Sequence, residues 1–313
     1  MTARLSSRAL GSLRFKREST FRVLSYYFSV RANRADLQRY LEHALDYFAV
    51  EPDLSEHRSP PTPGLPPRYS LVDVGKGPKR YRLFYCEDEL MVGPEPGTIV
   101  GYALWHINTE SLIRTREFFL VHSGAVVTPA GHGLLLPAAS GSGKTTLVAG
   151  LVRAGFGYLS DEAAAIDPVS RKLYPYPKAL TIKNSSRELF GELKPRRNGV
   201  LQDVWHVRAS EIRPDADGAP CDIRFVVAPR YRPGAGIELE SITPAAVVVE
   251  LWMNALSRSV YRGRGLALLA DVARVARGYR LVYGNLEGGV EAIARLTSSE
   301  ETDPAAAAVD VGA

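Results

Sequence analysis

The chain has 313 residues, of which 45% are hydrophobic and 23% are charged, and its formal net charge is +5. This composition is typical of a globular protein with one large domain or two modest ones. The scattered positive charge favours a phosphate ligand or an acidic partner without requiring nucleic acid. Two cysteines are too few for a disulfide framework, and no apolar run approaches the roughly 18 residues of a membrane span. We therefore expect a cytoplasmic protein with neither a nucleic-acid nor a membrane partner.

The first 95 residues are expected to form a small α+β domain. Apolar residues recur with strand and helix periods in turn, and prolines mark an irregular connection. In chain order we expect a strand at 21–30, a helix at 35–48, a proline-rich connection at 57–69 and a hairpin at 80–93. A further segment, at 97–113, is compatible with a helix that leads into the next domain.

Residues 96–297 are expected to form a second, larger α/β domain with a mixed, largely central sheet flanked by helices. Strands are predicted at 118–127, 134–138, 156–167, 221–231, 237–243 and 279–286, and helices at 145–154, 245–257 and 266–277. The first of these helices is expected to end at Gly155 and the last at Gly278, because glycine readily takes the left-handed conformation that follows a helix. Residues 298–313 lack periodicity and are expected to be a disordered tail.

The segment AASGSGKTT, residues 138–146, follows one of these strands and opens a helix. Gly143, Lys144 and Thr145 fill the last three positions of the phosphate-binding pattern G-x-x-x-x-G-K-[ST], whereas Ala138 replaces its first glycine. Glycines allow the backbone angles that turn amides toward an anion, and the following helix directs its positive end at phosphates. The residues expected to bind a nucleotide are Ser140, Gly141, Ser142, Gly143, Lys144, Thr145 and Thr146.

An acidic pair, Asp161 and Glu162, follows Lys144 after one helix, a glycine turn and a short strand. Such a connection brings the pair to the end of a strand near the phosphates. One carboxylate can then hold Mg²⁺ together with the Thr145 hydroxyl, and the other can accept a proton from an attacking hydroxyl. We assign the metal site to Thr145 and Asp161, and the spacing leaves open which acid is the base.

The block VHSG…LLLPAASGSGKTTLVAGLVRAGFGYLSDE resembles the catalytic core of the HPr serine kinase/phosphorylase family, especially its HPr-kinase-related branch. The likeness covers about residues 118–167. It implies a P-loop kinase fold with a nucleotide-binding core like that of PEP carboxykinase. His122, 22 positions before Lys144, matches the family's active-site histidine. The family usually has two aspartates where this chain has Asp161 and Glu162.

The resemblance implies an ATP- and Mg²⁺-dependent enzyme that transfers the γ-phosphoryl group to a serine hydroxyl of a protein or peptide. It also implies catalytic roles for His122, Lys144, Asp161 and Glu162, a reverse phosphorylase reaction and a homo-oligomer. The second signature of true HPr kinases is absent from the sequence, so the expected acceptor is not HPr itself. A proline-rich segment ending at Lys183 is similar to one in related kinases.

Other functions remain open on the residues alone. The same site could phosphorylate a small molecule such as free serine, or act as a nucleotide-dependent ATPase or switch. A GTPase is disfavoured because the guanine-reading motif N-K-x-D is absent from the sequence. Further candidates for phosphate or substrate contacts are Glu188, Trp205, His206, Arg230 and Arg232.

Overall fold

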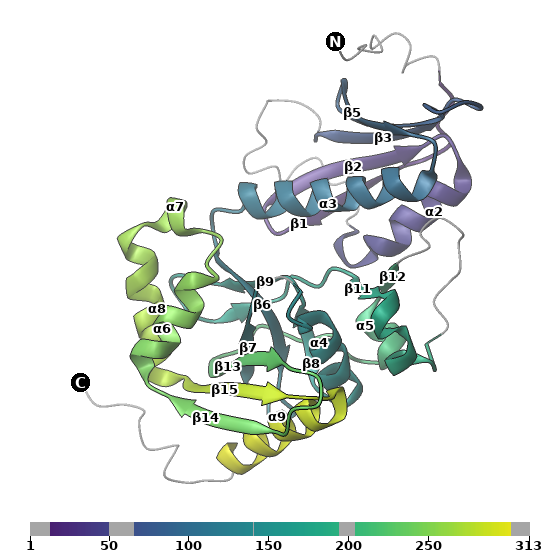
Figure 1. Ribbon diagram of the computed structural model, residues 1–313. Helices are drawn as coiled ribbons and strands as arrows, with labels where there is room; N and C mark the ends of the chain where they lie inside the picture. Colours follow the sequence, from purple (N-terminus) through teal and green to yellow (C-terminus); the bar gives the residue numbers. More distant parts are fainter. Residues whose placement is uncertain (1–12, 50–65, 140, 194–203, 302–313) are drawn as a thin grey trace. The chain divides into compact units, whose positions relative to one another are not determined.

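The computed structural model describes residues 13–49, 66–139, 141–193 and 204–301 (Figure 1). The chain divides into two compact units, Met1–Thr115 with Lys194–His206, and Arg116–Leu193 with Val207–Ala313. Both contain mixed sheets and helices, so the protein is of the mixed α/β class. Within the described ranges, no helix combines the length and the apolar character needed to cross a bilayer.

The first unit is built on a five-stranded sheet in the order β1-β2-β3-β4-β5. All neighbouring strands are antiparallel except β2 and β3, which are parallel. Its elements are β1 (Glu18–Val23), β2 (Tyr26–Ala32), α2 (Ala35–Ala44), the 3-10 helix η1 (Asp46–Phe48), β3 (Arg68–Asp73), β4 (Tyr81–Tyr85), β5 (Asp88–Gly93) and α3 (Pro96–Arg114). The hairpin at 80–93 and the helices expected here are present, but the single strand expected at 21–30 is divided by a turn at Leu24 and Ser25 into parts of β1 and β2. Most of the proline-rich connection, residues 57–65, lies outside the described residues.

Helix α3 extends this unit past the boundary expected at residue 95. Its buried side chains include Ile99, Val100, Ala103 and Ile107, and the helix packs on strands of the five-stranded sheet. The helix therefore completes the core of the first unit.

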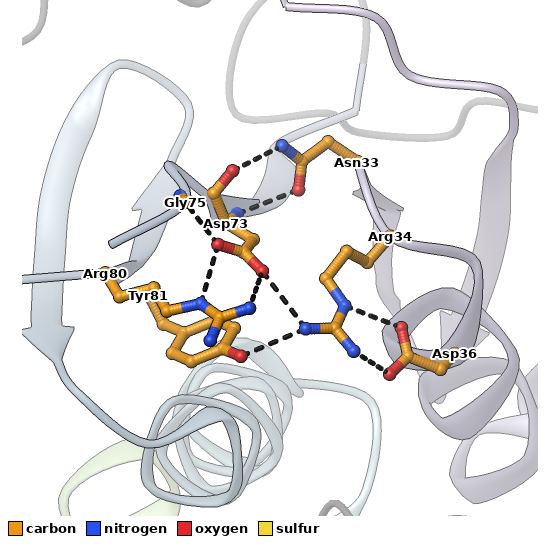
Figure 2. A network of polar contacts seen from close by, with 7 residues as sticks. All are labelled: Asn33, Arg34, Asp36, Asp73, Gly75, Arg80 and Tyr81. Carbon is orange, nitrogen blue, oxygen red and sulfur yellow. Dashed lines mark hydrogen bonds and ion pairs between the residues drawn. The ribbon is translucent and has the colours of Figure 1, made fainter. Parts of the chain in front are cut away.

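A polar network ties the start of α2 to the β3–β4 turn (Figure 2). The Asp73 carboxylate accepts hydrogen bonds from Arg80 at 3.0 and 2.8 Å and from Arg34 at 3.1 Å. Asn33 pairs with the backbone of Asp73 through both atoms of its amide. Hydrogen bonds to the carboxylate from Arg80, which is the strongest, and then from the backbone amide of Gly75 and from Arg34 lower the pKa of Asp73 to about 2. The network consists of paired groups, and we assign it a structural role.

The second unit contains an eight-stranded mixed sheet in the order β10-β9-β6-β7-β13-β15-β14, with β8 also paired to β6. The parallel pairs are β7–β13 and β13–β15, and the rest are antiparallel. The sheet strands are β6 (Phe119–Val127), β7 (Gly133–Pro137), β8 (Gly157–Ser160), β9 (Ala163–Ile166), β10 (Leu173–Tyr174), β13 (Ile223–Tyr231), β14 (Glu238–Ile242) and β15 (Arg277–Tyr283). The remaining elements of this unit are α4 (Lys144–Arg153), β11 (Leu180–Lys183), the 3-10 helix η2 (Asn184–Phe190), α5 (Ala209–Ile212), α6 (Pro244–Met253), α7 (Arg258–Tyr261), α8 (Gly263–Val275) and α9 (Leu286–Glu301). Strand β12 (Val204–Val207) falls at the division, with its first three residues in the first unit and Val207 in the second.

Two helix layers enclose this sheet (Figure 1). Helices α6 and α8 pack together on one face, and α4 and α9 pack together on the other. The core under α6 and α8 includes Val247, Leu251, Leu269 and Val272, which lie against apolar residues of the sheet strands. Helix α4, which carries the glycine-rich loop at its start, is therefore held on a packed sheet.

Three details of this unit differ from the sequence-based expectations. The strand expected at 156–167 is divided into β8 and β9 by the turn at Asp161 and Glu162. Gly155 follows α4 with φ +107°, as predicted, but Gly278 lies inside strand β15 and does not end a helix. A Cβ at Gly278 would come within 2.2 Å of Val247 Cγ2, so the glycine is needed for close packing of α6 on the sheet. The tail was expected to be disordered from 298, yet α9 continues to Glu301. Residues 302–313 lie outside the described residues.

Candidate functional site

The glycine-rich loop lies between the end of β7 and the start of α4. Gly141 has φ +83° and Gly143 has φ +86°, which are left-handed conformations that favour glycine. Gly143 is the residue that precedes α4, so the free amides of the first helical turn open toward the loop. The hydroxyl oxygen of Ser142 is buried and has no hydrogen-bond partner within the described structure. Ser140 lies outside the described residues.

Close packing of α4 on the sheet fixes where this loop lies. Gly124 of β6 faces the helix, and a Cβ there would come within 2.7 Å of Val148 Cγ2. Leu147 and Val148 are fully buried, so the first turn of α4 rests directly on the strand. The side chain that follows Gly143 is thereby placed opposite His122 on the same strand.

Lys144 is a buried cation with two acceptors. Its Nζ donates to the carbonyl oxygen of Ala138 at 2.7 Å and lies 3.0 Å from Nε2 of His122. Only 6% of the residue is exposed, and burial lowers the pKa of the ammonium group. Carboxylates on Asp161 and Glu162 partly offset this effect.

His122 is held by bonds on both ring nitrogens. Its Nδ1 lies 2.9 Å from the carbonyl oxygen of Glu162, which can only accept, so Nδ1 carries the proton. Nε2 then offers its lone pair to Lys144, which gives a neutral ring with a defined tautomer. Burial, and next the charge of Lys144, lower the pKa of His122, in agreement with that neutral form.

The predicted metal ligands Thr145 and Asp161 lie side by side. The Thr145 hydroxyl donates to Oδ2 of Asp161 at 2.8 Å. The other carboxylate oxygen, Oδ1, accepts from Lys178 Nζ at 2.9 Å and lies 3.2 Å from the Tyr158 hydroxyl, whose one proton is shared with the Lys178 carbonyl oxygen. Asp161 is only 3% exposed, so these donors compensate a carboxylate withdrawn from water.

Glu162 occupies the same turn and is more accessible. The Ser160 hydroxyl accepts hydrogen bonds from the amides of Glu162 and Ala163 at 3.1 and 3.0 Å, which tightens the β8–β9 connection. The Glu162 side chain is 31% exposed, with Oε1 3.6 Å from His122 Nδ1 and Oε2 3.9 Å from Lys178 Nζ. Of the two acids, Glu162 therefore has the carboxylate that is freer to meet a substrate.

Lys178 is a site residue that the sequence interpretation missed. Its ammonium contacts both acids, and attraction to Asp161 and Glu162 raises its pKa although burial acts in the opposite direction. Its carbonyl oxygen accepts from the Tyr158 hydroxyl at 2.7 Å, which fixes the backbone beside Asp161. The signal available in the sequence was the segment YPYPKAL, where prolines on both sides of Tyr176 hold an extended chain ahead of a lysine.

These groups border one cavity of about 410 Å³. Thr146 reaches across it to Ser186, with 3.0 Å between the two hydroxyl oxygens. The lining residues come from β6, the loop, α4, the acidic turn and the 178–186 segment: His122, Gly141, Gly143, Lys144, Thr145, Thr146, Asp161, Glu162, Lys178, Thr181, Lys183, Ser185 and Ser186. The cavity has the size of a small-molecule site and a strongly polar wall.

Several other candidates are not among the lining residues. Arg230 and Arg232 are exposed at and just after the end of β13, and Glu188 is exposed on η2. His206 belongs to the first unit, where its Nδ1 lies 2.7 Å from the Tyr40 hydroxyl. The structure brings His122, Lys144, Thr145, Asp161 and Glu162 together around the cavity, whereas these other candidates lie outside its lining.

The chain matches no protein-family model and no curated protein. Among the described residues, no group of three or more His, Cys, Asp or Glu side chains is arranged to hold a metal ion. Chemical assignment of the site therefore rests on its own geometry.

Proposed function

We propose that this chain is an ATP-dependent kinase that transfers the γ-phosphoryl group to a serine hydroxyl of a protein or peptide. The observation that carries the proposal is a single cavity bordered both by Lys144 and the left-handed glycine loop and by Asp161 and Glu162. Phosphoryl transfer needs an anion-binding cradle, a metal ligand and a proton acceptor in one place. The cavity offers a residue for each.

The nucleotide's phosphates would bind at the start of α4. Backbone amides of the loop and of the first helical turn favour an anion there, and Lys144 adds a full positive charge. His122 would act as a positioning residue, since its neutral Nε2 holds the Lys144 ammonium at 3.0 Å.

Thr145 and Asp161 fit a magnesium site. They supply a hydroxyl and a carboxylate oxygen 2.8 Å apart, and Mg²⁺ in nucleotide enzymes takes few protein ligands and fills its shell with phosphates and water. When bound, Mg²⁺ would neutralise charge on the β- and γ-phosphates. The absence of a three-residue metal cluster among the described side chains is compatible with such a site.

Glu162 is the better candidate for the proton acceptor. Both oxygens of Asp161 are already bonded to donors, whereas Glu162 is accessible and its carboxylate borders the cavity. In the proposed step, Glu162 takes the proton of the acceptor hydroxyl while the oxygen of that hydroxyl bonds to the γ-phosphorus. The bond between the γ-phosphorus and the β–γ bridging oxygen breaks, and ADP leaves with that oxygen.

The sequence resemblance to the HPr-kinase-related branch agrees with this proposal and suggests a serine acceptor. It also suggests ATP as the donor and a cytoplasmic location.

Labelled ATP with a panel of serine peptides, and with free serine, tests the proposal. We expect Mg²⁺-dependent label transfer by the wild type and its loss in Lys144→Ala, Asp161→Asn and Glu162→Gln. Losses of about 2 kcal/mol or more of transition-state stabilisation are typical when such groups are removed. Rapid γ-phosphate release with no acceptor would favour an ATPase or switch, and equal activity in all four proteins would contradict the site.

A further inference from the structure

Charged groups around the cavity give it a net positive character before any ligand enters. Lys144, Lys178 and Lys183 supply three ammonium groups, and Asp161 and Glu162 supply two carboxylates. His122 is neutral, as argued above. The residues that line the cavity therefore carry one net positive charge, which repels a bare divalent cation and attracts a polyphosphate.

Lys178 is the cation that lies directly on the acid pair. Its Nζ is 2.9 Å from Oδ1 of Asp161 and 3.9 Å from Oε2 of Glu162. Lys144 contacts a carbonyl oxygen and a histidine ring instead. Lys183 is exposed at the end of β11. The Lys178 ammonium thus neutralises much of the negative charge of the two carboxylates that would attract a metal ion.

The Lys178 ammonium is accessible from the cavity. Its side chain is 16% exposed and borders the same cavity as the loop and the acid pair. The backbone of Lys178 is fixed independently, through the bond from the Tyr158 hydroxyl to its carbonyl. A change of the side chain can therefore alter the charge beside Asp161 while the segment stays in place.

We propose that Lys178 is a resident counter-cation of the acid pair, which prevents a divalent metal from binding alone and makes metal binding depend on the nucleotide. A nucleoside triphosphate brings enough negative charge to offset the ammonium, so the metal enters as its nucleotide complex. The inference rests on the proposed function for the identity of that ligand. Lys178 acts here as a positioning and selectivity residue.

Binding of Mn²⁺, a paramagnetic substitute for Mg²⁺, tests the inference without any reaction. Free Mn²⁺ is measured by electron paramagnetic resonance as it is added to the full-length protein in the absence of nucleotide. We expect Lys178→Met to bind one Mn²⁺ about tenfold or more tightly than the wild type, because a neighbouring positive charge has been removed. Lys178→Arg, which keeps the charge, should bind Mn²⁺ as weakly as the wild type.

Two further variants show where the gained ion binds. The double variant Lys178→Met with Asp161→Asn should lose the gain, because a neutral amide is a poor ligand for the ion. Lys172→Met removes an exposed lysine that is paired with Asp222 and is not among the residues that line the cavity, and it should leave Mn²⁺ affinity unchanged. Circular dichroism of each variant establishes that it is folded.

An unchanged Mn²⁺ affinity in folded Lys178→Met would overturn the inference. So would a gain that persists after Asp161→Asn, or an equal gain in Lys178→Arg. Failure of the kinase proposal would give a different result, namely no binding of ATP with Mg²⁺ by the wild type. The Mn²⁺ measurement uses no nucleotide, so the two failures can be told apart.

Discussion

The ammonium nitrogen of Lys144 lies 3.0 Å from Nε2 of His122, whose other ring nitrogen bonds to the carbonyl oxygen of Glu162. The ring therefore connects Lys144, at the start of α4, to the backbone of the acidic turn. Burial lowers the pKa of both Lys144 and His122, so their charged forms are disfavoured in the folded protein. Such placement is typical of groups kept for function at a cost in stability.

Replacing Lys144 with methionine should separate function from stability. A lysine whose pKa is lowered by folding destabilises the folded protein at every pH below its unfolded pKa, and neutral pH lies in that range. Lys144→Met removes that penalty and keeps a side chain of similar length. We expect the free energy of unfolding from urea titration to stay equal or rise by about 1 kcal/mol, while the affinity for ATP falls. A clear fall in stability would show that Lys144 is needed for packing.

The lowered pKa of His122 predicts a pH effect with a defined sign. As the pH falls below the ordinary value of 6.5, the unfolded chain takes up a proton on this side chain before the folded protein does. The free energy of unfolding should therefore decrease on acidification through that range. His122→Gln does not titrate there, so its stability should fall less between pH 8 and 5. Parallel stability curves for the two proteins would contradict the assignment.

Glu162→Gln should separate chemistry from binding. If Glu162 takes the acceptor proton, transfer of label to a serine peptide should fall by about 100-fold or more, while affinity for ATP with Mg²⁺ changes little. Asp161→Asn should instead weaken the Mg²⁺ dependence of ATP binding, because it removes a metal ligand. Steady-state kinetics and calorimetry on both variants check this division. The roles would be reversed if Glu162→Gln mainly lost metal-dependent binding.

Sequence patterns predicted most elements of the fold, because apolar periodicity and turn residues are local. The strand and helix around the glycine-rich loop were placed within a residue or two, and Gly155 ends α4 as expected. Gly278 was misplaced because its role is a close contact with Val247 from a distant helix. Helix α9 was not predicted, and one reason is that Gly288 and Gly289 weaken its helical pattern.

The site was predictable where its residues form a contiguous motif. Lys144, Thr145, Asp161 and Glu162 are all recognisable from spacing, and the cavity brings them together. Lys178 was not recognisable from the sequence, since its pairing with Asp161 depends on how the 175–183 segment folds back beside β8. Lys183, selected from the same segment, borders the cavity without an ion pair to either acid among the described residues.

The packing of α6 on the sheet gives a prediction about stability alone. Gly278→Ala places a methyl group within 2.2 Å of Val247 Cγ2, so we expect a loss of about 1–3 kcal/mol of unfolding free energy. Gly236→Ala is a matched control, because nothing lies within 4 Å of its added Cβ. Urea unfolding of both variants measures the difference. Equal stabilities would mean that the helix moves away at no cost.

The central claim is that the loop at the start of α4 binds a nucleoside triphosphate through Lys144. Isothermal titration of ATP into the wild type and Lys144→Met, with Mg²⁺ present, tests it most directly. We predict saturable binding by the wild type and an affinity lower by about tenfold or more in the variant. No uptake of ATP or GTP by the wild type, or equal affinity in the two proteins, would contradict the claim.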